Sequence, residues 1–247
     1  MKTLKKIITL LFVVGLTGAN AQSGSGGYKP YLKGSVGMAD YNDSSLEGFG
    51  FSGGFNESIV YSFEGGFYAS DQFSFGFEYT AFDLDGDLVT ENMSTDLADN
   101  LNSIFEIAPT APNFNEGYTG KFQDDYDLDR FMFVMNYEYF LKEDITISLS
   151  GGLGIIHAKQ SVKASRDADG DGTVHSLQTL VNSEADDTVF AYQLGVNFGY
   201  HFNDGYTLYT GVRYLASSSI DFNHGAFILN DEDVDIVSYD IGLRYAF

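Results

Sequence analysis

Hydrophobic and polar positions alternate strictly in the C-terminal segment 233–247. One face of a strand over this segment would carry only apolar side chains: Val237, Tyr239, Ile241, Leu243, Tyr245 and Phe247. The other face would carry small, polar and charged residues: Ser238, Asp240, Gly242, Arg244 and Ala246. The side chains of a strand point alternately to its two faces. The pattern therefore predicts a strand with lipid on one side and a polar lumen on the other.

Seven further segments show the same alternation, and a long aromatic stripe marks residues 190–202. The segments are 28–38, 59–67, 73–81, 131–141, 145–155, 190–202 and 206–216. Their lengths are close to the roughly 9 to 11 residues that a tilted strand needs to cross a bilayer. Together with the C-terminal segment they predict an all-β fold, an eight-stranded antiparallel up-and-down transmembrane β-barrel with both termini in the periplasm.

The connections between these segments alternate in length. Three are tight turns at residues 70–72, 142–144 and 203–205, and the last contains an Asp-Gly pair that favours positive φ. Between the turns lie long polar stretches over residues 42–58, 84–129, 160–187 and 217–232. Transmembrane barrels have short periplasmic turns and longer extracellular loops. The spacing therefore predicts four long extracellular loops.

A soluble β-sandwich or a lipocalin-like barrel would show the same alternation. Such a protein would bury its aromatic stripe and expose its charges. Here most strands carry a continuous stripe of Phe, Tyr, Leu or Val, and the opposite face holds a few charges among Gly, Ser and Asn. Because charges inside a barrel are tolerated only if they pair, the pattern favours the membrane barrel over the soluble alternative.

The N-terminal segment 1–21 has the three parts of an export signal. Residues 1–6 are basic, residues 7–18 are apolar but too short to span a bilayer, and Ala19-Asn20-Ala21 forms a cleavage site. We expect a cleaved signal peptide over 1–21, a flexible Gly/Ser-rich lead over 22–27 and an outer-membrane β-barrel domain over 28–247. Export and barrel pattern together predict the outer membrane of a Gram-negative bacterium.

The chain is strongly acidic and contains no cysteine. It has 35 acidic and 13 basic side chains and a net charge of −22, which becomes −25 when the three lysines of segment 1–21 are removed. This charge excludes nucleic acid as a partner. Without cysteine the chain can form neither disulfides nor thiolate metal sites, and it cannot carry a lipoprotein anchor.

The predicted inward face carries a balanced set of charges. It has four basic and four acidic residues: Lys33, Arg130, Arg213, Arg244, Glu64, Glu78, Glu138 and Asp240. Buried charges need partners, and eight strands enclose a space that side chains can fill. The eight residues are therefore predicted to form an ion-pair network that closes the lumen. The alternative is a narrow, porin-like conduit for small solutes, lined by the four bases.

These features together resemble the OmpA/OmpX-type small outer-membrane barrels, which belong to the porin-like β-barrel proteins. The resemblance is architectural and covers the chain after the signal, including the terminal Tyr245-Ala246-Phe247. It implies contact with outer-membrane lipid and lipopolysaccharide. It also implies that the outer-membrane assembly machinery reads an assembly signal in the last strand, here Tyr239, Leu243, Tyr245 and Phe247. One feature departs from the group: the chain has no Trp, so Tyr and Phe must form the interfacial girdles. We also expect no peptidoglycan-binding domain after Phe247, and therefore no tether to the cell wall.

One loop motif matches the opening of an EF-hand-type calcium loop. Asp167, Asp169 and Asp171 stand at positions one, three and five, Gly172 at six, and Thr173 at seven, where its carbonyl could bind the ion. Gln178 replaces the bidentate Glu of position twelve, and the flanks are predicted strands rather than helices. The motif predicts weak calcium binding, and a solvated acidic turn is the alternative.

The longest predicted loop, residues 84–129, is strongly acidic. The spacing of its apolar residues predicts a short amphipathic helix over 95–107, and Asp83, Asp85 and Asp87 are expected at a solvated loop entrance. A loop this long in a compact barrel is usually functional or disordered. It is the best candidate for contact with an extracellular ligand or surface, or with divalent cations that bridge lipopolysaccharide.

An enzymatic role is an alternative, because some small barrels that resemble this one acylate or deacylate lipid A. Such chemistry requires a nucleophile beside a base. The chain has four histidines: His157, His175, His201 and His224. His175 precedes Ser176, but a His-x-Ser spacing that would place both on one strand face is missing. The sequence therefore favours a non-enzymatic, monomeric barrel with a structural or surface-interaction role, and no cofactor apart from weakly bound calcium.

Overall fold

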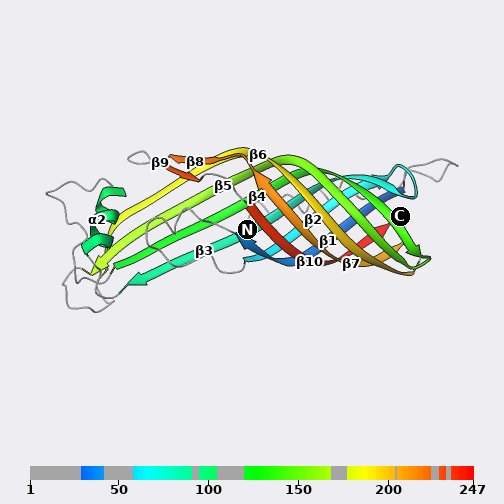
Figure 1. Ribbon diagram of the computed structural model, residues 1–247, viewed down its shortest axis with the longest axis horizontal. Coiled ribbons are helices and arrows are strands. Elements are labelled where there is room, and N and C mark those ends of the chain that lie inside the picture. The colour runs from blue at the N-terminus through cyan, green and yellow to red at the C-terminus, as the bar shows by residue number, and fades with distance from the viewer. Residues whose placement is uncertain are drawn as a thin grey trace.

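The computed structural model describes residues 29–41, 58–90, 95–104, 120–167, 177–203, 205–223, 228–231 and 235–247. Long strands dominate this part of the chain (Figure 1). The strands are β1 (Lys29–Tyr41), β2 (Ser58–Tyr68), β3 (Phe73–Thr90), β4 (Gly120–Lys142), β5 (Ile145–Asp167), β6 (Leu177–Asn203), β7 (Tyr206–Ser217), β8 (Ile220–Asn223), β9 (Ile228–Asp231) and β10 (Asp235–Ala246). A helix, α2 (Thr95–Ile104), lies within the segment 95–107 for which one was predicted. Among the described residues, no helix has the length and apolar character needed to cross a bilayer.

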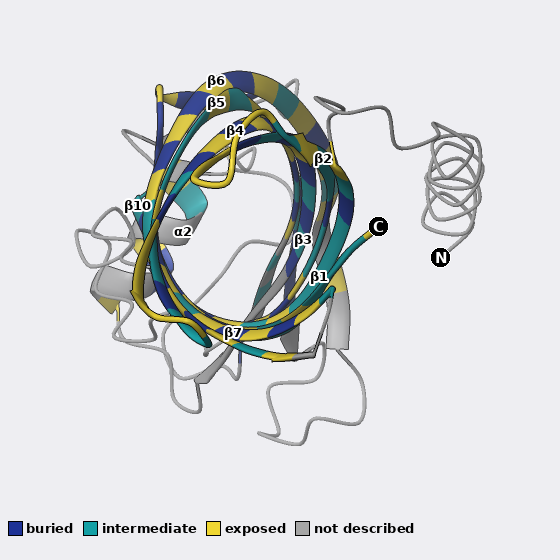
Figure 2. Cartoon of the chain, turned by 90° about the vertical axis from the view of Figure 1, so that its right-hand side faces the viewer, coloured by how far each residue is buried: buried dark blue, intermediate teal, exposed yellow. Residues whose placement is uncertain are grey.

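Eight strands close into a barrel in the order β1, β10, β7, β6, β5, β4, β3, β2 (Figure 2). Every neighbouring pair is antiparallel, and β1 closes on β10 with Tyr31 opposite Ala246. The strands β8 and β9 pair separately. The predicted eight-stranded antiparallel up-and-down barrel is therefore confirmed. The tight turns lie at one end of it, the turn end, where Gly205 has the positive φ of 116° that was expected there.

The exterior of the barrel is apolar over most of its height. Phe77 is 70% exposed, Leu153 59% and Leu194 60%, and their neighbours on β3, β4, β5 and β6 are similar. Over the same height the charged residues Glu78, Arg130 and Glu138 of β3 and β4 are buried in the lumen, so the orientation of the faces is the predicted one and the lipocalin-like alternative is excluded. An exposed apolar surface this continuous is typical of a membrane interface. We call this surface the belt.

The two faces exchange character on β3, β4, β5 and β6. A row of residues paired across these strands consists of Tyr79, Phe131, Ile155 and Phe190, all on the outer face. The next outward-facing row consists of Ala81, Asp129, His157 and Thr188. Beyond it the four strands continue over residues 81–90, 120–129, 157–167 and 177–188, which we call the extension (left in Figure 1).

The extension is apolar inside and charged outside. Leu128, Ala158 and Val162 on its inner face are at most 2% exposed. On its outer face Lys159 pairs with Glu184 at 3.0 Å, and this hydrogen bond together with the negative charge of Glu184 raises the pKa of Lys159. This is the arrangement of a β-sheet in water rather than in lipid.

The predicted loop boundaries were wrong on these four strands. Segments 84–129 and 160–187 were expected to be loops, but β3 continues to Thr90, β4 begins at Gly120, β5 continues to Asp167 and β6 begins at Leu177. Asp83, Asp85 and Asp87 lie within β3 and not at a loop entrance. The prediction treated the loss of outward apolar residues as the end of each strand. The alternation in fact continues with its two faces exchanged.

Candidate functional site in the lumen

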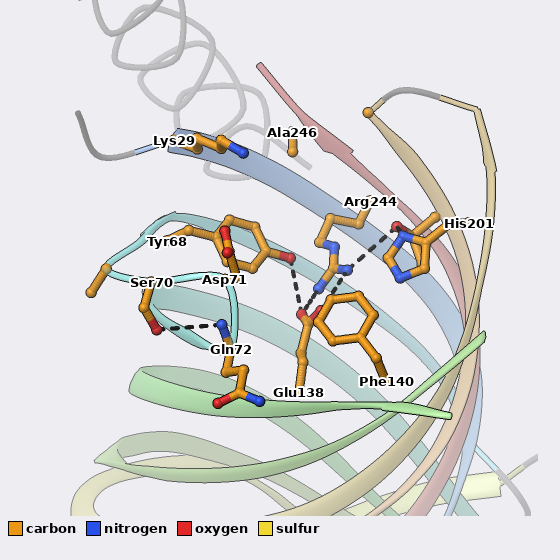
Figure 3. A pocket seen from close by; sticks show the side chains of 13 residues that line it. Lys29, Tyr68, Ser70, Asp71, Gln72, Glu138, Phe140, His201, Arg244 and Ala246 are labelled. Atoms are coloured by element: carbon orange, nitrogen blue, oxygen red, sulfur yellow. Dashed lines mark hydrogen bonds and ion pairs between the residues drawn. The ribbon is translucent and has the colours of Figure 1, made fainter. Parts of the chain in front are cut away.

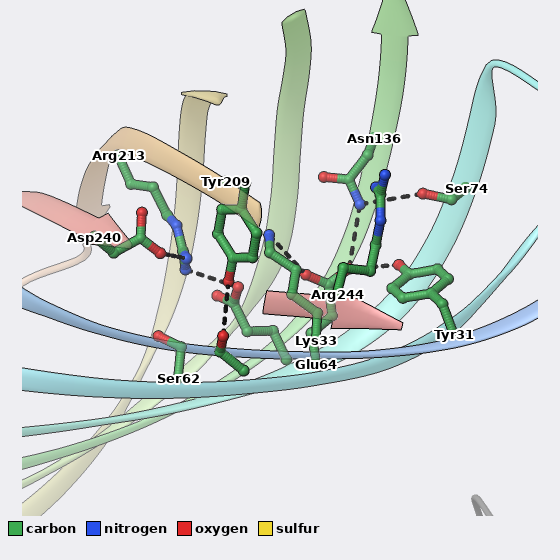
Figure 4. A network of polar contacts seen from close by, with 12 residues as sticks. Tyr31, Lys33, Ser62, Glu64, Ser74, Asn136, Tyr209, Arg213, Asp240 and Arg244 are labelled. Carbon is green, nitrogen blue, oxygen red and sulfur yellow. Dashed lines mark hydrogen bonds and ion pairs between the residues drawn. The ribbon is translucent and has the colours of Figure 1, made fainter. Parts of the chain in front are cut away.

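A charged network fills the middle of the lumen, and Glu78 on β3 is its centre (Figure 4 shows neighbouring members). Arg130 Nη2 on β4 donates to Glu78 Oε1 at 2.5 Å, and Arg213 Nη1 on β7 donates to Glu78 Oε2 at 2.7 Å. Arg213 Nη2 also donates to Asp240 on β10. Gln193 Nε2 adds a hydrogen bond to Glu78 Oε1 at 3.3 Å. One carboxylate thus joins two guanidinium groups from different strands.

A second group of charges lies closer to the turn end. Lys33 Nζ is 3.2 Å from Glu64 Oε2, and Tyr31 donates its hydroxyl hydrogen to Glu64 Oε1 at 2.5 Å (Figure 4). Arg244 pairs with Glu138, and Tyr68 donates to the same carboxylate at 2.9 Å (Figure 3). The structure therefore brings all eight charged residues expected in the lumen into ion pairs, with equal numbers of acids and bases.

Lys33 pairs with Glu64 directly across the β1–β2 ladder, but two other pairs, Arg213–Glu78 and Arg244–Glu138, cross the barrel, and the strand register explains why. Glu64 lies directly opposite Glu78 in the β2–β3 ladder, and Lys33 lies opposite Arg244 in the β1–β10 ladder. Like charges placed directly across a ladder destabilise it. The opposite charges come from other strands, since Arg213 reaches Glu78 and Glu138 reaches Arg244.

Sequence reasoning missed the tyrosines that complete the network. Tyr31 is only 2% exposed although it is aromatic, and it lies on the same face of β1 as Lys33. Tyr68 shares the inward face of β2 with Glu64. Both tyrosines are separated by an even number of residues from a charged residue that points inward. Because side chains alternate along a strand, this spacing predicts that they point inward too, although aromatic residues are typical of the lipid face.

Some buried polar atoms of the network remain without a hydrogen-bond partner among the described residues. They include Arg130 Nε and Nη1, Gln193 Oε1, Asn197 Oδ1 and Asp240 Oδ1. A cavity of about 20 Å³ adjoins the network and is lined by residues that include Lys33, Asn197 and Arg244. A volume of this size holds about one water molecule. This space within the network therefore suits a single water molecule.

An apolar layer closes the lumen on the side of the extension. Ile156, Leu215 and Ile236 belong to it, and β8 contributes Ile220 and Phe222, which are 1% and 0% exposed. The Arg130 guanidinium lies 5.5 Å from the centre of the Phe82 ring and marks the boundary between this layer and the charged network. The polar lumen predicted for the barrel does not continue on the extension side, where the inner face is apolar.

The turn end is open and contains a polar pocket of about 850 Å³ (Figure 3). The Arg244–Glu138 pair lies among its lining residues, together with Lys29, Gln72 and Phe140. His201 also lines it, and its Nδ1 lies 2.9 Å from Thr207 Oγ1. The pocket therefore borders the charged network at the Arg244–Glu138 pair.

The remaining predicted site residues lie at the two ends of the molecule. Asp167 is the last residue of β5, while Asp169, Asp171 and Thr173 lie outside the described residues, as do His175, His224, the signal segment 1–21 and the lead 22–27. Among the described residues no group of three or more His, Cys, Asp or Glu side chains is placed to hold a metal ion. The predicted assembly signal lies on β10 and the C-terminal residue. Its members Tyr239, Leu243 and Phe247 are exposed on the belt, and the Tyr245 ring packs 4.8 Å from that of Phe247.

No protein-family model and no curated protein matches the chain. Among solved structures it is similar to Neisserial surface protein A, with 14% sequence identity, 92% of this chain and 100% of that chain covered, and a TM-score of 0.49. It is also similar to Ail of Yersinia pestis, with 9% identity, 89% and 99% covered and a TM-score of 0.44. OprG of Pseudomonas aeruginosa gives 15% identity, 91% and 98% covered and a TM-score of 0.38. By its own closed eight-stranded antiparallel topology and its apolar exterior, the chain has the architecture of the OmpA/OmpX-type small outer-membrane barrels.

Proposed function

We propose that the protein is a non-enzymatic, integral outer-membrane barrel with a closed lumen, which serves envelope structure or surface interaction through its acidic extracellular part. The observation that carries this proposal is the exchange of the two faces on β3 to β6, from the belt to the charged extension. A sheet that continues beyond the bilayer into water would present its charged outer side chains at the cell surface.

The boundary between belt and extension has the chemistry of a membrane interface. Tyr79 on the last apolar row donates its hydroxyl hydrogen to Asp129 at 2.5 Å, and Tyr214 donates to Asp235 at 2.8 Å. Tyrosines with an apolar ring and a hydrated hydroxyl are enriched at such interfaces. Because short turns belong to the periplasmic side, the extension lies outside the cell in this proposal.

Two different closures in series support a silent lumen. The charged network blocks the middle of the barrel with side chains from six strands, and the apolar layer with Phe222 blocks the side of the extension. An ion that crossed would have to break buried pairs and then enter an apolar layer, and both steps are costly.

The alternative function is a narrow, porin-like channel for small solutes. The pocket of about 850 Å³ at the turn end favours it, because part of the path is already open. Single-channel recording in planar bilayers separates the two functions. Folded protein, verified by its heat-dependent gel migration, is expected to give no conductance steps, and stable steps would support the channel instead.

The proposed orientation can be tested without background because the chain has no cysteine. Asp127→Cys places a thiol on the exposed outer face of the extension, and Ser70→Cys places one in an exposed turn between β2 and β3. A membrane-impermeant maleimide added to intact cells is expected to label the first variant and to leave the second unlabelled. Labelling of Ser70→Cys alone would show that the orientation is the opposite one and would contradict the surface role.

The proposed partners follow from this placement. The belt contacts outer-membrane lipid and lipopolysaccharide, the assembly machinery reads the last strand, the barrel acts as a monomer, and an extracellular ligand or surface contacts the extension.

Calcium remains a proposal for the loop that starts at Asp167. A calcium titration is expected to give a response that is lost in the variant with Asn at 167, 169 and 171, and an equal response from that variant would show that the loop does not bind the ion.

A lipid A-modifying enzyme is the remaining alternative. His157 Nδ1 lies 3.0 Å from Thr188 Oγ1 on the outer face of the sheet, at the start of the extension. In the proposed non-enzymatic role, lipid A incubated with the folded protein keeps its mass. Loss or gain of an acyl chain, abolished by His157→Ala, would overturn that role.

A further inference from the structure

The belt is uneven around the barrel. Aromatic side chains cover its β3, β4 and β6 sides, where Phe77, Phe133 and Phe198 are exposed. On β1 the outward positions are smaller, with Val36 and Met38 in its second half. The strands on either side of β1 carry the exposed tyrosines Tyr61 on β2 and Tyr239 on β10, so the surface is lower along β1 between them.

A groove of about 730 Å³ lies on the seam where β1 meets β10, and we call it the seam groove. Its outward-facing lining side chains come from four adjacent strands: Val36, Met38, Ile59, Thr210, Tyr239 and Ile241. They are exposed and, with one exception, strongly apolar. The exception is Thr210, whose hydroxyl hydrogen is donated to the backbone carbonyl of Asp240 at 3.0 Å. Since this bond satisfies the hydroxyl, the threonine adds no free donor to the groove.

The groove runs along β1 from Val36 to Asp40, roughly 13 Å of extended strand at about 3.3 Å per residue. Lys29 lines the pocket at the turn end, so the stretch from Val36 to Asp40 lies in the half of β1 remote from the turns. Asp40 is exposed at the end of the groove. The apolar stretch of the trough can accommodate part of a hydrocarbon chain, and Asp40 marks the polar end of the groove.

We propose that the seam groove binds the acyl chain of one outer-leaflet membrane lipid in a defined position. The groove is continuous with the belt, whose partner is hydrocarbon, and this continuity identifies lipid as the occupant. The assignment of this lipid to the outer leaflet rests on the proposed orientation of the barrel. The occupation of the groove by an acyl chain does not depend on that orientation. The lipid fills a hollow that would otherwise interrupt the packing of the bilayer against the barrel.

The first test fills the groove with a side chain. Thr210→Trp places a large ring in the groove, and Leu149→Trp places the same ring at an exposed belt position on β5, away from the seam. Protein is extracted from membranes in mild detergent, and lipids bound to each barrel are counted by native mass spectrometry. Wild type and Leu149→Trp are expected to retain one lipid, and Thr210→Trp to lose it.

Three results would overturn the proposal. The first is equal lipid retention by Thr210→Trp and wild type, and the second is no lipid on wild type. The third is a lipid-free wild-type dimer that Thr210→Trp dissociates, because the occupant of the groove would then be a second copy of the chain.

A second measurement does not depend on extraction. Because the chain has no Trp, Tyr239→Trp at the groove and Tyr192→Trp on β6 each report alone in vesicles that contain brominated acyl chains.

A tryptophan beside a single bound chain loses fluorescence in proportion to the brominated fraction. A tryptophan that touches several exchanging chains is quenched more steeply at low fractions. We expect the first behaviour for Tyr239→Trp and the second for Tyr192→Trp, and identical curves would exclude the defined site. Reversed labelling of the cysteine variants would change only the leaflet, so failure of the orientation and failure of the groove are distinguishable.

Discussion

Glu78 offers the sharpest test of the charged network, because Glu78→Gln removes one charge and almost no volume. Glu78 is 4% exposed and receives hydrogen bonds from both Arg130 and Arg213. Arg213 keeps Asp240 as a partner after the change. Arg130 is 1% exposed, and Glu78 is the acid that pairs with it in the described part of the chain. The substitution therefore leaves a buried guanidinium without its counter-charge.

The expected cost follows from this geometry. Removing one partner of a buried ion pair destabilises a protein by about 3 to 5 kcal/mol, because the other charge stays buried and uncompensated. Nε and Nη1 of Arg130 already have no partner among the described residues, so its guanidinium has little reserve. With a urea dependence of about 1 to 3 kcal/mol per molar, the unfolding midpoint should fall by at least roughly 1 M.

The assay is urea unfolding in phospholipid vesicles, followed by far-UV circular dichroism and by the gel migration of unheated samples. Phe77→Leu on the lipid face of the same strand is the matched control and should shift stability by less than about 1.5 kcal/mol. Adding Arg130→Met to Glu78→Gln removes the stranded charge and should recover part of the loss, with a coupling of about 0.5 to 3 kcal/mol. A single variant as stable as wild type, or a double variant that recovers nothing, would refute the ion-pair reasoning.

Three further changes test other parts of the barrel. Gly242→Ala should cost about 1 to 3 kcal/mol, because its new methyl group meets the Gly34 backbone carbonyl and the Tyr209 hydroxyl. Gly151→Ala, whose methyl group makes only an ordinary contact with Leu194 at 3.9 Å, should be nearly neutral in the same urea assay. Phe222→Ala should loosen the apolar layer, so that limited proteolysis cuts the extension while the heat-dependent gel shift of the barrel persists; equal resistance would contradict this role. Phe247→Ser should lower the amount of folded protein in cell membranes and leave refolding into vesicles unchanged, and an equal loss in both would assign Phe247 to stability rather than to assembly.

The face of each residue could be predicted from sequence, because parity along a strand is a local property. Once Phe77 was assigned to lipid, Glu78 had to point inward, and the structure agrees. The same rule placed Arg213 and Asp240 in the lumen. Parity says nothing of which inward charges meet, because partners depend on the register between strands. Glu78 pairs with Arg130 and Arg213 and lies across from Glu64, and no local pattern contains that information.

The ends of the long strands could not be predicted for a different reason. Outward apolar residues occur on β4 only from Phe131 onward, and the predicted strand therefore began at this residue. The strand in fact begins at Gly120, and its inward positions become apolar where its outward positions become polar, as Leu128 and Asp127 show. A pattern that reverses its phase resembles a pattern that ends, unless both faces are followed separately.

The exchange of faces is what one continuous sheet must do when it passes from lipid into water. In lipid, apolar side chains are favoured outside and charges survive inside only as pairs such as Arg130 with Glu78. In water the outer face is free to carry charge, and the inner face must become apolar to exclude water. On β4 the inner face changes from Arg130 to Leu128 and the outer face from Phe131 to Asp129, within two residues of each other. Both faces therefore respond to one boundary, and that boundary also separates the charged network in the lumen from the charged surface on which the proposed function rests.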